Sequence, residues 1–102
     1  MMYHKLVRDK IPDIIRKQGE TPTTRILTAK EYTAALEQKL DEETSEFYRE
    51  KNLEELADIL EVVYALAEDL GSTKEELLRI YDEKHENRGG FRDRLFLISK
   101  DG

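Results

Sequence analysis

The stretch LEQKLDEETSEFYREKNLEELADIL, residues 36–60, decides the fold of this chain. Apolar residues recur at helical spacing on both sides of a short polar connection around Glu50 to Asn52. Two helices joined by so few residues pack as an antiparallel hairpin. Residues that are equidistant from the turn are therefore expected to face each other across the two helices.

The helical pattern continues in both directions, and residues 29–87 predict three helices. Each start resembles a capping box, in which a Ser, Thr or Asn is followed three residues later by Glu. The pairs are Thr28 and Glu31, Asn52 and Glu55, and Ser72 and Glu75. Glycines mark the ends, with Gly71 after the second of these helices and Gly89-Gly90 after the third.

The flanking segments predict a short helix and two short β-prone runs. Ile11 to Gln18 is typical of a short helix, because Pro12 is tolerated in a first turn. Thr24–Leu27 and Leu95–Ser99 are each too short to be stable alone, so we expect them to pair as a small β ribbon. Residues 1–102 are thus expected to form a single domain, an all-α helical bundle of about four helices.

The composition limits the kinds of function. Cysteine is absent, which excludes disulfides, thiolate zinc sites and cysteine nucleophiles. The net charge of −6 argues against nucleic acid as a partner, because binding to a phosphate backbone depends on Lys and Arg. Apolar runs are only a few residues long, so we expect a soluble, cytoplasmic protein without a membrane partner.

Charge is uneven along the sequence. Residues 1–30 carry seven Lys/Arg and three Asp/Glu, whereas residues 31–61 carry three Lys/Arg and eleven Asp/Glu. An acidic middle beside a basic end suits a metal ion that bridges the protein to a small phosphate ligand.

Two acidic residues interrupt the apolar face of the helix that precedes the turn. That face is formed by Tyr32, Leu36, Leu40 and Phe47. Glu43 falls in its middle, seven residues after Leu36 and four before Phe47, and Glu46 lies one turn further along the same side. An ordinary amphipathic helix would not carry a charge at position 43.

The helix after the turn repeats this anomaly. Its main apolar stripe consists of Leu53, Leu56, Leu60, Val63 and Ala67, and Ile59, Val62 and Leu66 widen it. Glu55 falls beside Val62 and Leu66, and Asp58 lies at the border of the same sector. Across the turn, Glu46 faces Glu55 and Glu43 faces Asp58, in two rungs roughly 4.5 Å apart along the axis.

Four carboxylates this close together would repel one another and resist desolvation, and a bound divalent cation would remove the conflict. Oxygen ligands without Cys or His favour a hard ion, Mg²⁺ or Mn²⁺. Simpler explanations remain for each acid taken singly. One explanation is that Glu55 is simply the third-position partner of the Asn52 cap and binds no metal. Another is that the run Asp41-Glu42-Glu43 is solvated helix surface.

The pattern Glu42-Glu43-x-x-Glu46 followed by Glu55-x-x-Asp58 resembles the EExxE and ExxD signature of the all-α nucleoside triphosphate pyrophosphohydrolases, the superfamily of MazG and phosphoribosyl-ATP pyrophosphohydrolase. Residues 5–12 (KLVRDKIP) and 88–91 (RGGF) are similar to a MazG-like subgroup of small single-domain members. The segment between the two acidic motifs is shorter here than is usual in that superfamily.

This resemblance implies Mg²⁺ ligands at Glu43, Glu46, Glu55 and Asp58, and phosphate contacts at Lys84 and Arg88. It implies hydrolysis of a nucleoside triphosphate between its α and β phosphates to the monophosphate and pyrophosphate, a role in nucleotide-pool house-cleaning. Glu46 would accept a proton from the attacking water. Arg8 and Lys10 are further candidates for phosphate contacts. The resemblance also suggests a homodimer or homotetramer.

Two other functions remain open at this point. One is phosphoribosyl-ATP as the substrate. The other is a noncatalytic helical module, which either dimerises through its apolar stripes or binds nucleotides without turnover. The sequence itself supports association only through the wide apolar faces of two of its predicted helices.

Overall fold

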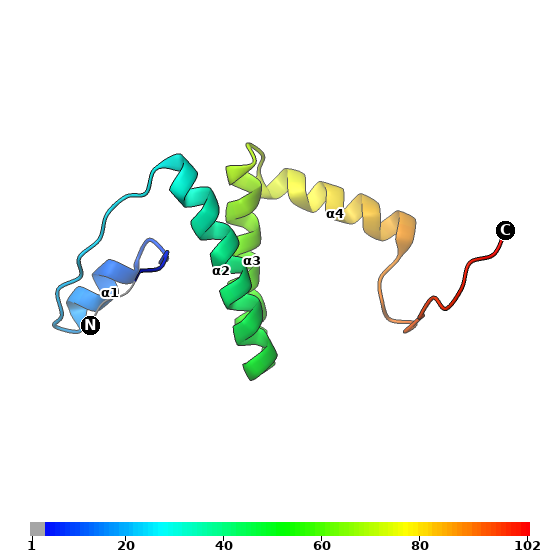
Figure 1. Ribbon diagram of the computed structural model, residues 1–102, viewed down its shortest axis with the longest axis horizontal. Coiled ribbons are helices and arrows are strands. Elements are labelled where there is room, and N and C mark those ends of the chain that lie inside the picture. Colours follow the sequence, from blue (N-terminus) through cyan, green and yellow to red (C-terminus); the bar gives the residue numbers. More distant parts are fainter. Residues whose placement is uncertain (1–3) are drawn as a thin grey trace.

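The computed structural model describes residues 4–102, and within these residues the chain forms four helices and no strand. The helices are α1 (Ile11–Lys17), α2 (Ala29–Glu50), α3 (Leu53–Asp69) and α4 (Lys74–Arg88). Helices α2 and α3 lie side by side and antiparallel, and α4 leaves the end of this pair that is opposite the α2–α3 turn (Figure 1). The predicted all-α class and the predicted hairpin are confirmed.

The turn of the hairpin is as tight as the sequence predicts. Lys51 adopts the left-handed conformation (φ 50°, ψ 50°) and its N–H donates to the carbonyl of Phe47, which ends α2. Asn52 then caps α3, because its side-chain oxygen accepts from the N–H of Glu55 at 2.9 Å. Two residues therefore reverse the chain, and the mirror relation between the helices is preserved.

The open end of the hairpin is fixed by polar contacts. Thr28 and Glu31 form the predicted capping box, in which each side chain bonds the backbone N–H of the other. The Thr33 hydroxyl donates to the Asp69 carboxylate at 2.7 Å, which joins the start of α2 to the end of α3. Both ends of the hairpin are thus held in register.

The predicted cap of α4 is wrong by one residue. Thr73, not Ser72, is the cap, and its hydroxyl accepts from the N–H of Glu76 at 3.0 Å. Ser72 is already used in closing α3, because its N–H donates to the carbonyl of Ala67 while Gly71 (φ 87°) donates to that of Glu68. This is the Schellman arrangement, which requires a left-handed residue such as glycine after the helix.

The core of one chain is small. Within the described residues, the buried apolar residues are Leu36, Val62 and Ala67, which are 2%, 6% and 8% exposed. Leu36 lies on α2, and Val62 and Ala67 lie on α3, so all three buried residues belong to the hairpin. Many other large apolar side chains stay exposed.

The predicted β ribbon is wrong. Thr24–Leu27 and Leu95–Ser99 are extended but unpaired, and Ile26 and Ile98 are 98% and 93% exposed. The first segment precedes α2, whereas the second follows α4, and they lie at opposite ends of the molecule (Figure 1). They do not meet because α4 diverges from the hairpin and carries the C-terminal segment away.

Because α4 diverges from the hairpin, the four helices of one chain do not pack together into the helical bundle that the sequence predicts. The molecule is 62 Å long and 22 Å thick, and α1 leads away from the hairpin on the other side (Figure 1). Each helix among residues 4–102 is either too short or too polar to cross a bilayer.

Candidate metal centre

The hairpin brings three carboxylates together. Glu43 lies on α2, Glu55 and Asp58 lie on α3, and one carboxylate oxygen of each lies within 4.8 Å of the other two. All three residues are partly buried. Two oxygens on opposite sides of an octahedral Mg²⁺ lie about 4.2 Å apart, from two bonds of about 2.1 Å. Small changes of side-chain rotamer would therefore let these oxygens share one ion, and an all-oxygen donor set suits a hard cation.

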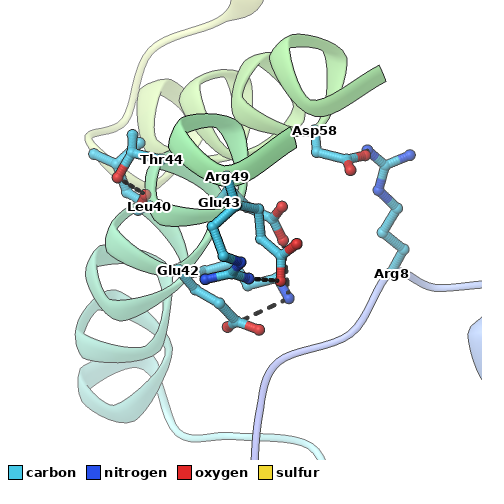
Figure 2. A network of polar contacts seen from close by, with 9 residues as sticks. Arg8, Leu40, Glu42, Glu43, Thr44, Arg49 and Asp58 are labelled. Atoms are coloured by element: carbon cyan, nitrogen blue, oxygen red, sulfur yellow. Dashed lines mark hydrogen bonds and ion pairs between the residues drawn. The ribbon is translucent and has the colours of Figure 1, made fainter. Parts of the chain in front are cut away.

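Two basic side chains already balance part of this negative charge. Lys39, one turn before Glu43 on α2, lies 3.2 Å from its carboxylate. Arg8 reaches from the segment before α1 and places Nη2 2.8 Å from Oδ1 of Asp58. Figure 2 shows the Arg8 and Asp58 side chains pointing toward each other across the gap between that segment and α3. The sequence analysis expects a divalent cation to neutralise the carboxylates, whereas in the structure two basic side chains of the protein itself neutralise part of their charge.

Glu55 is the acid that these cations leave uncompensated. Among the described residues, no lysine or arginine forms an ion pair with it. Partial burial, followed by the nearby charges of Glu46, Asp58 and Glu43, raises the pKa of Glu55 above its usual range. A cation bound among these carboxylates would therefore reduce the electrostatic repulsion on Glu55 more than on Glu43 or Asp58.

Glu46 lies beside this group rather than in it. Its carboxylate bonds Arg49, one turn further along α2, at 2.9 Å, and its side chain is 39% exposed. It is level with Glu55 across the turn, as the mirror relation requires, and its charge acts on the pKa of Glu55. The structure thus brings three of the four predicted ligands together and holds the fourth next to them.

A hollow of about 420 Å³ opens between this acidic group and the N-terminal segment. It is lined by residues from the segment 5–11 and by Lys39, Glu43 and Asp58. Carboxylates therefore border one part of the hollow, and the side chains of Lys5, Arg8 and Lys39 border another. An anionic ligand bridged by a metal would meet both kinds of group.

The predicted phosphate-contacting residues fall in different places. Arg8 lies in the hollow, where it pairs with Asp58. Lys10 is the exposed residue that precedes α1. Lys84 and Arg88 lie in the last part of α4, which extends away from the end of the hairpin opposite the turn, so one chain does not bring them to the acids (Figure 1).

Lys39 is a site residue that the sequence pattern did not single out. Its side chain is 19% exposed, and it contacts both Glu42, at 3.6 Å, and Glu43. The signal was present as a lysine four residues before a glutamate on the same helix face. Such pairs are common on solvated helices, so the spacing alone gave no reason to select this one.

Comparison with known proteins finds a partial match to a bacterial protein. A segment of 42 residues, 41% of this chain, is 57% identical to an uncharacterized protein of Mycolicibacterium smegmatis (strain ATCC 700084 / mc(2)155). The chain covers 43% of the length of that protein. No family model and no solved structure matches this chain.

Proposed function

We propose that this protein hydrolyses a nucleoside triphosphate between its α and β phosphates, releasing the monophosphate and pyrophosphate, and that the reaction depends on Mg²⁺, with Mn²⁺ as a substitute. The observation that carries the proposal is the group of Glu43, Glu55 and Asp58, whose oxygens lie within 4.8 Å of one another beside a hollow that also contains basic side chains. The resemblance of the acidic motifs to the MazG-like pyrophosphohydrolases points to the same chemistry.

The carboxylates would hold the ion. Glu43 would give up its contact with Lys39, and Asp58 its contact with Arg8, to bind the ion. Glu55 forms no ion pair with a lysine or arginine among the described residues, so the ion would neutralise its charge without displacing a partner. When bound, the ion supplies charge neutralisation for the phosphate chain and a more acidic water.

The basic residues would bind the phosphates. Arg8, once released from Asp58, can turn its planar guanidinium toward a phosphate, to which it can make two parallel hydrogen bonds. Lys39 would add a positive charge from the α2 side of the hollow. The side chains of Arg8 and Lys39 would thus each replace an ion pair with a carboxylate of the protein by one with a phosphate of the ligand.

Glu46 would act as the general base. It lies one turn from Glu43 and level with Glu55, outside the three-carboxylate group, so its oxygens remain available to a water molecule next to the ion. Its contact with Arg49, on an exposed surface, is of the kind that contributes little and is readily exchanged.

The proposal is tested by measuring pyrophosphate release from a panel of canonical and modified nucleoside triphosphates, and from phosphoribosyl-ATP, with Mg²⁺, with Mn²⁺ and with a chelator. We expect metal-dependent release from at least one nucleoside triphosphate. Release from phosphoribosyl-ATP alone would identify that substrate instead. If Mg²⁺ raises the melting temperature but no nucleotide is hydrolysed, the protein is a binder without turnover and the proposal is wrong.

Glu55→Gln and Glu54→Gln form a matched pair for this test. The two residues are adjacent, but Glu55 belongs to the carboxylate group and Glu54 is an exposed residue outside it. Glu55→Gln is expected to lower kcat/KM by about a hundredfold or more, because stabilisation of charge by a metal is worth several kcal/mol and each 1.4 kcal/mol is a factor of ten. Glu54→Gln should leave activity unchanged. Equal effects of the two substitutions would contradict the site.

A further inference from the structure

Residues 4–17, which we call the N-terminal arm, are packed loosely against the α2–α3 hairpin. None of these residues is buried, and within the described residues α1 packs along none of the other three helices. Arg8 nevertheless reaches from the arm to Asp58, 50 residues further along the chain, and its Nη2 lies 2.8 Å from Oδ1 (Figure 2). Segments with few buried contacts open at a low cost in free energy. The arm can therefore move while the hairpin stays folded.

The two cations beside the carboxylates differ in how they are attached. Lys39 lies on α2, the helix that also carries its partner Glu43, and its side chain is 19% exposed. Arg8 comes from the arm, and its side chain is 54% exposed. A movement of the arm would carry Arg8 away from Asp58 without disturbing either helix, whereas Lys39 would stay beside the site.

Charge decides which ligand can take the place of Arg8. The three carboxylates carry three negative charges, and Lys39 and Arg8 carry two positive ones. A free dication would give the site an excess of positive charge close to the guanidinium, and like charges at short range repel each other. A dication that arrives with a phosphate ligand brings negative charge with it. The phosphate also offers the guanidinium a new partner, to which it can make two parallel hydrogen bonds.

We propose that the N-terminal arm is a strap that Arg8 controls. The guanidinium holds Asp58 until a metal-bound phosphate enters the hollow, and it then transfers to the phosphate and brings the arm down over the ligand. Val7 and Ile11 of the arm line the same hollow, so the closed arm would exclude water from it. The site would thus select the complex of metal and phosphate over the free metal. This role rests on the proposed function, because it requires the carboxylates to bind a divalent ion.

Calorimetric titration of the full chain with two ligands tests this selection. The ligands are Mn²⁺ alone and the preformed equimolar complex of Mn²⁺ with imidodiphosphate, a pyrophosphate analogue that resists hydrolysis. Arg8→Gln should bind Mn²⁺ alone about fivefold more tightly than the wild type, because the competitor for Asp58 is removed. It should bind the complex about tenfold more weakly, because the phosphate loses a charged hydrogen-bond donor. The two affinities are thus expected to change in opposite directions.

Arg16→Gln is the matched control for Arg8→Gln. Arg16 also belongs to the arm, and its side chain is 57% exposed. It pairs with Asp13, which lies outside the carboxylate group. This substitution should leave both affinities unchanged. Thermal melts of both variants should match that of the wild type, because each substitution replaces one exposed polar side chain by another.

Hydrogen exchange of the wild-type chain tests the movement of the arm. The N–H of Ile11 donates to the carbonyl of Arg8 at 3.0 Å, so exchange at Ile11 reports on the start of α1. Peptides from the arm should exchange faster with Mg²⁺ alone than without metal, because the ion displaces Arg8 from Asp58. They should exchange more slowly with Mg²⁺ and imidodiphosphate together. Equal exchange under all three conditions would overturn the closing of the arm.

The outcomes separate the strap from the proposed function. If Arg8→Gln weakens the binding of Mn²⁺ alone as well as that of the complex, Arg8 orients Asp58 for the ion, and the strap is wrong while the metal site stands. If neither affinity changes, Arg8 has no part in the site and the strap is again wrong. If neither the wild type nor Arg8→Gln binds Mn²⁺ in either form, the carboxylates hold no ion, and the strap and the proposed function are both wrong.

Discussion

The α2–α3 hairpin differs from the C-terminal third of the chain, which consists of α4 and the segment after it, in how much apolar surface it buries. In the hairpin, apolar faces of two long helices cover each other, and caps close both ends. More than half of the residues of α4 are charged, none of its residues is buried, and the apolar residues from Leu95 to Ile98 are exposed. The comparison teaches that local capping suffices to define a helix, whereas its direction depends on apolar surface that it can bury.

The two regions are expected to differ most in how much stability is lost when an apolar side chain is truncated. Leu36→Ala truncates a residue of the hairpin that is 2% exposed, and it should lower the free energy of unfolding by about 2–5 kcal/mol. Leu95→Ala, at a residue that is 90% exposed, should change it by less than about 0.5 kcal/mol. Chemical denaturation of both variants provides the measurement. Equal losses would mean that the C-terminal segment is covered as thoroughly as the hairpin.

A smaller difference is expected at the helix caps. Asn52 and Thr73 make the same kind of bond, at 2.9 and 3.0 Å, to the third residue of α3 and of α4. Asn52→Ala should cost about 1 kcal/mol of global stability, because α3 unfolds only with the hairpin. Thr73→Ala should act mainly on α4, and hydrogen exchange should show faster exchange in its first turn with little change in the global midpoint. The reverse pattern would show that α4, not the hairpin, limits stability.

The smallest effect is a dependence on pH at the start of α2. Bonds from Arg25 and from the backbone of Thr28 lower the pKa of Glu31 from 4.5 to about 2. A carboxyl whose pKa is lower in the folded state stabilises the fold above its ordinary pKa, and this contribution disappears as the pH falls through the folded value. The melting temperature of Glu31→Gln should therefore lie below that of the wild type at pH 6, and the two should converge between pH 4.5 and 2. A constant difference across this range would contradict the assignment.

The candidate site divides in a similar way into a part that the sequence predicts and a part that it does not. The spacing of Glu43, Glu46, Glu55 and Asp58 from the turn is enough to place them level across the hairpin. Which three of them come within reach of one ion depends on side-chain direction, and Glu46 turns to Arg49 instead. Arg8 lies 50 residues from Asp58 in the sequence, and no spacing rule connects residues so far apart.

The sequence by itself determined the four helices, the tight reversal at Lys51 and Asn52, and the meeting of acids from two helices, because each follows from local periodicity, capping and turn length. Only the tertiary structure decided the direction of α4, the separation of the two extended segments, and the pairing of Arg8 with Asp58. These features depend on which surfaces and charges meet across the fold. Interactions between distant residues set them, and no pattern within a single helix records such interactions.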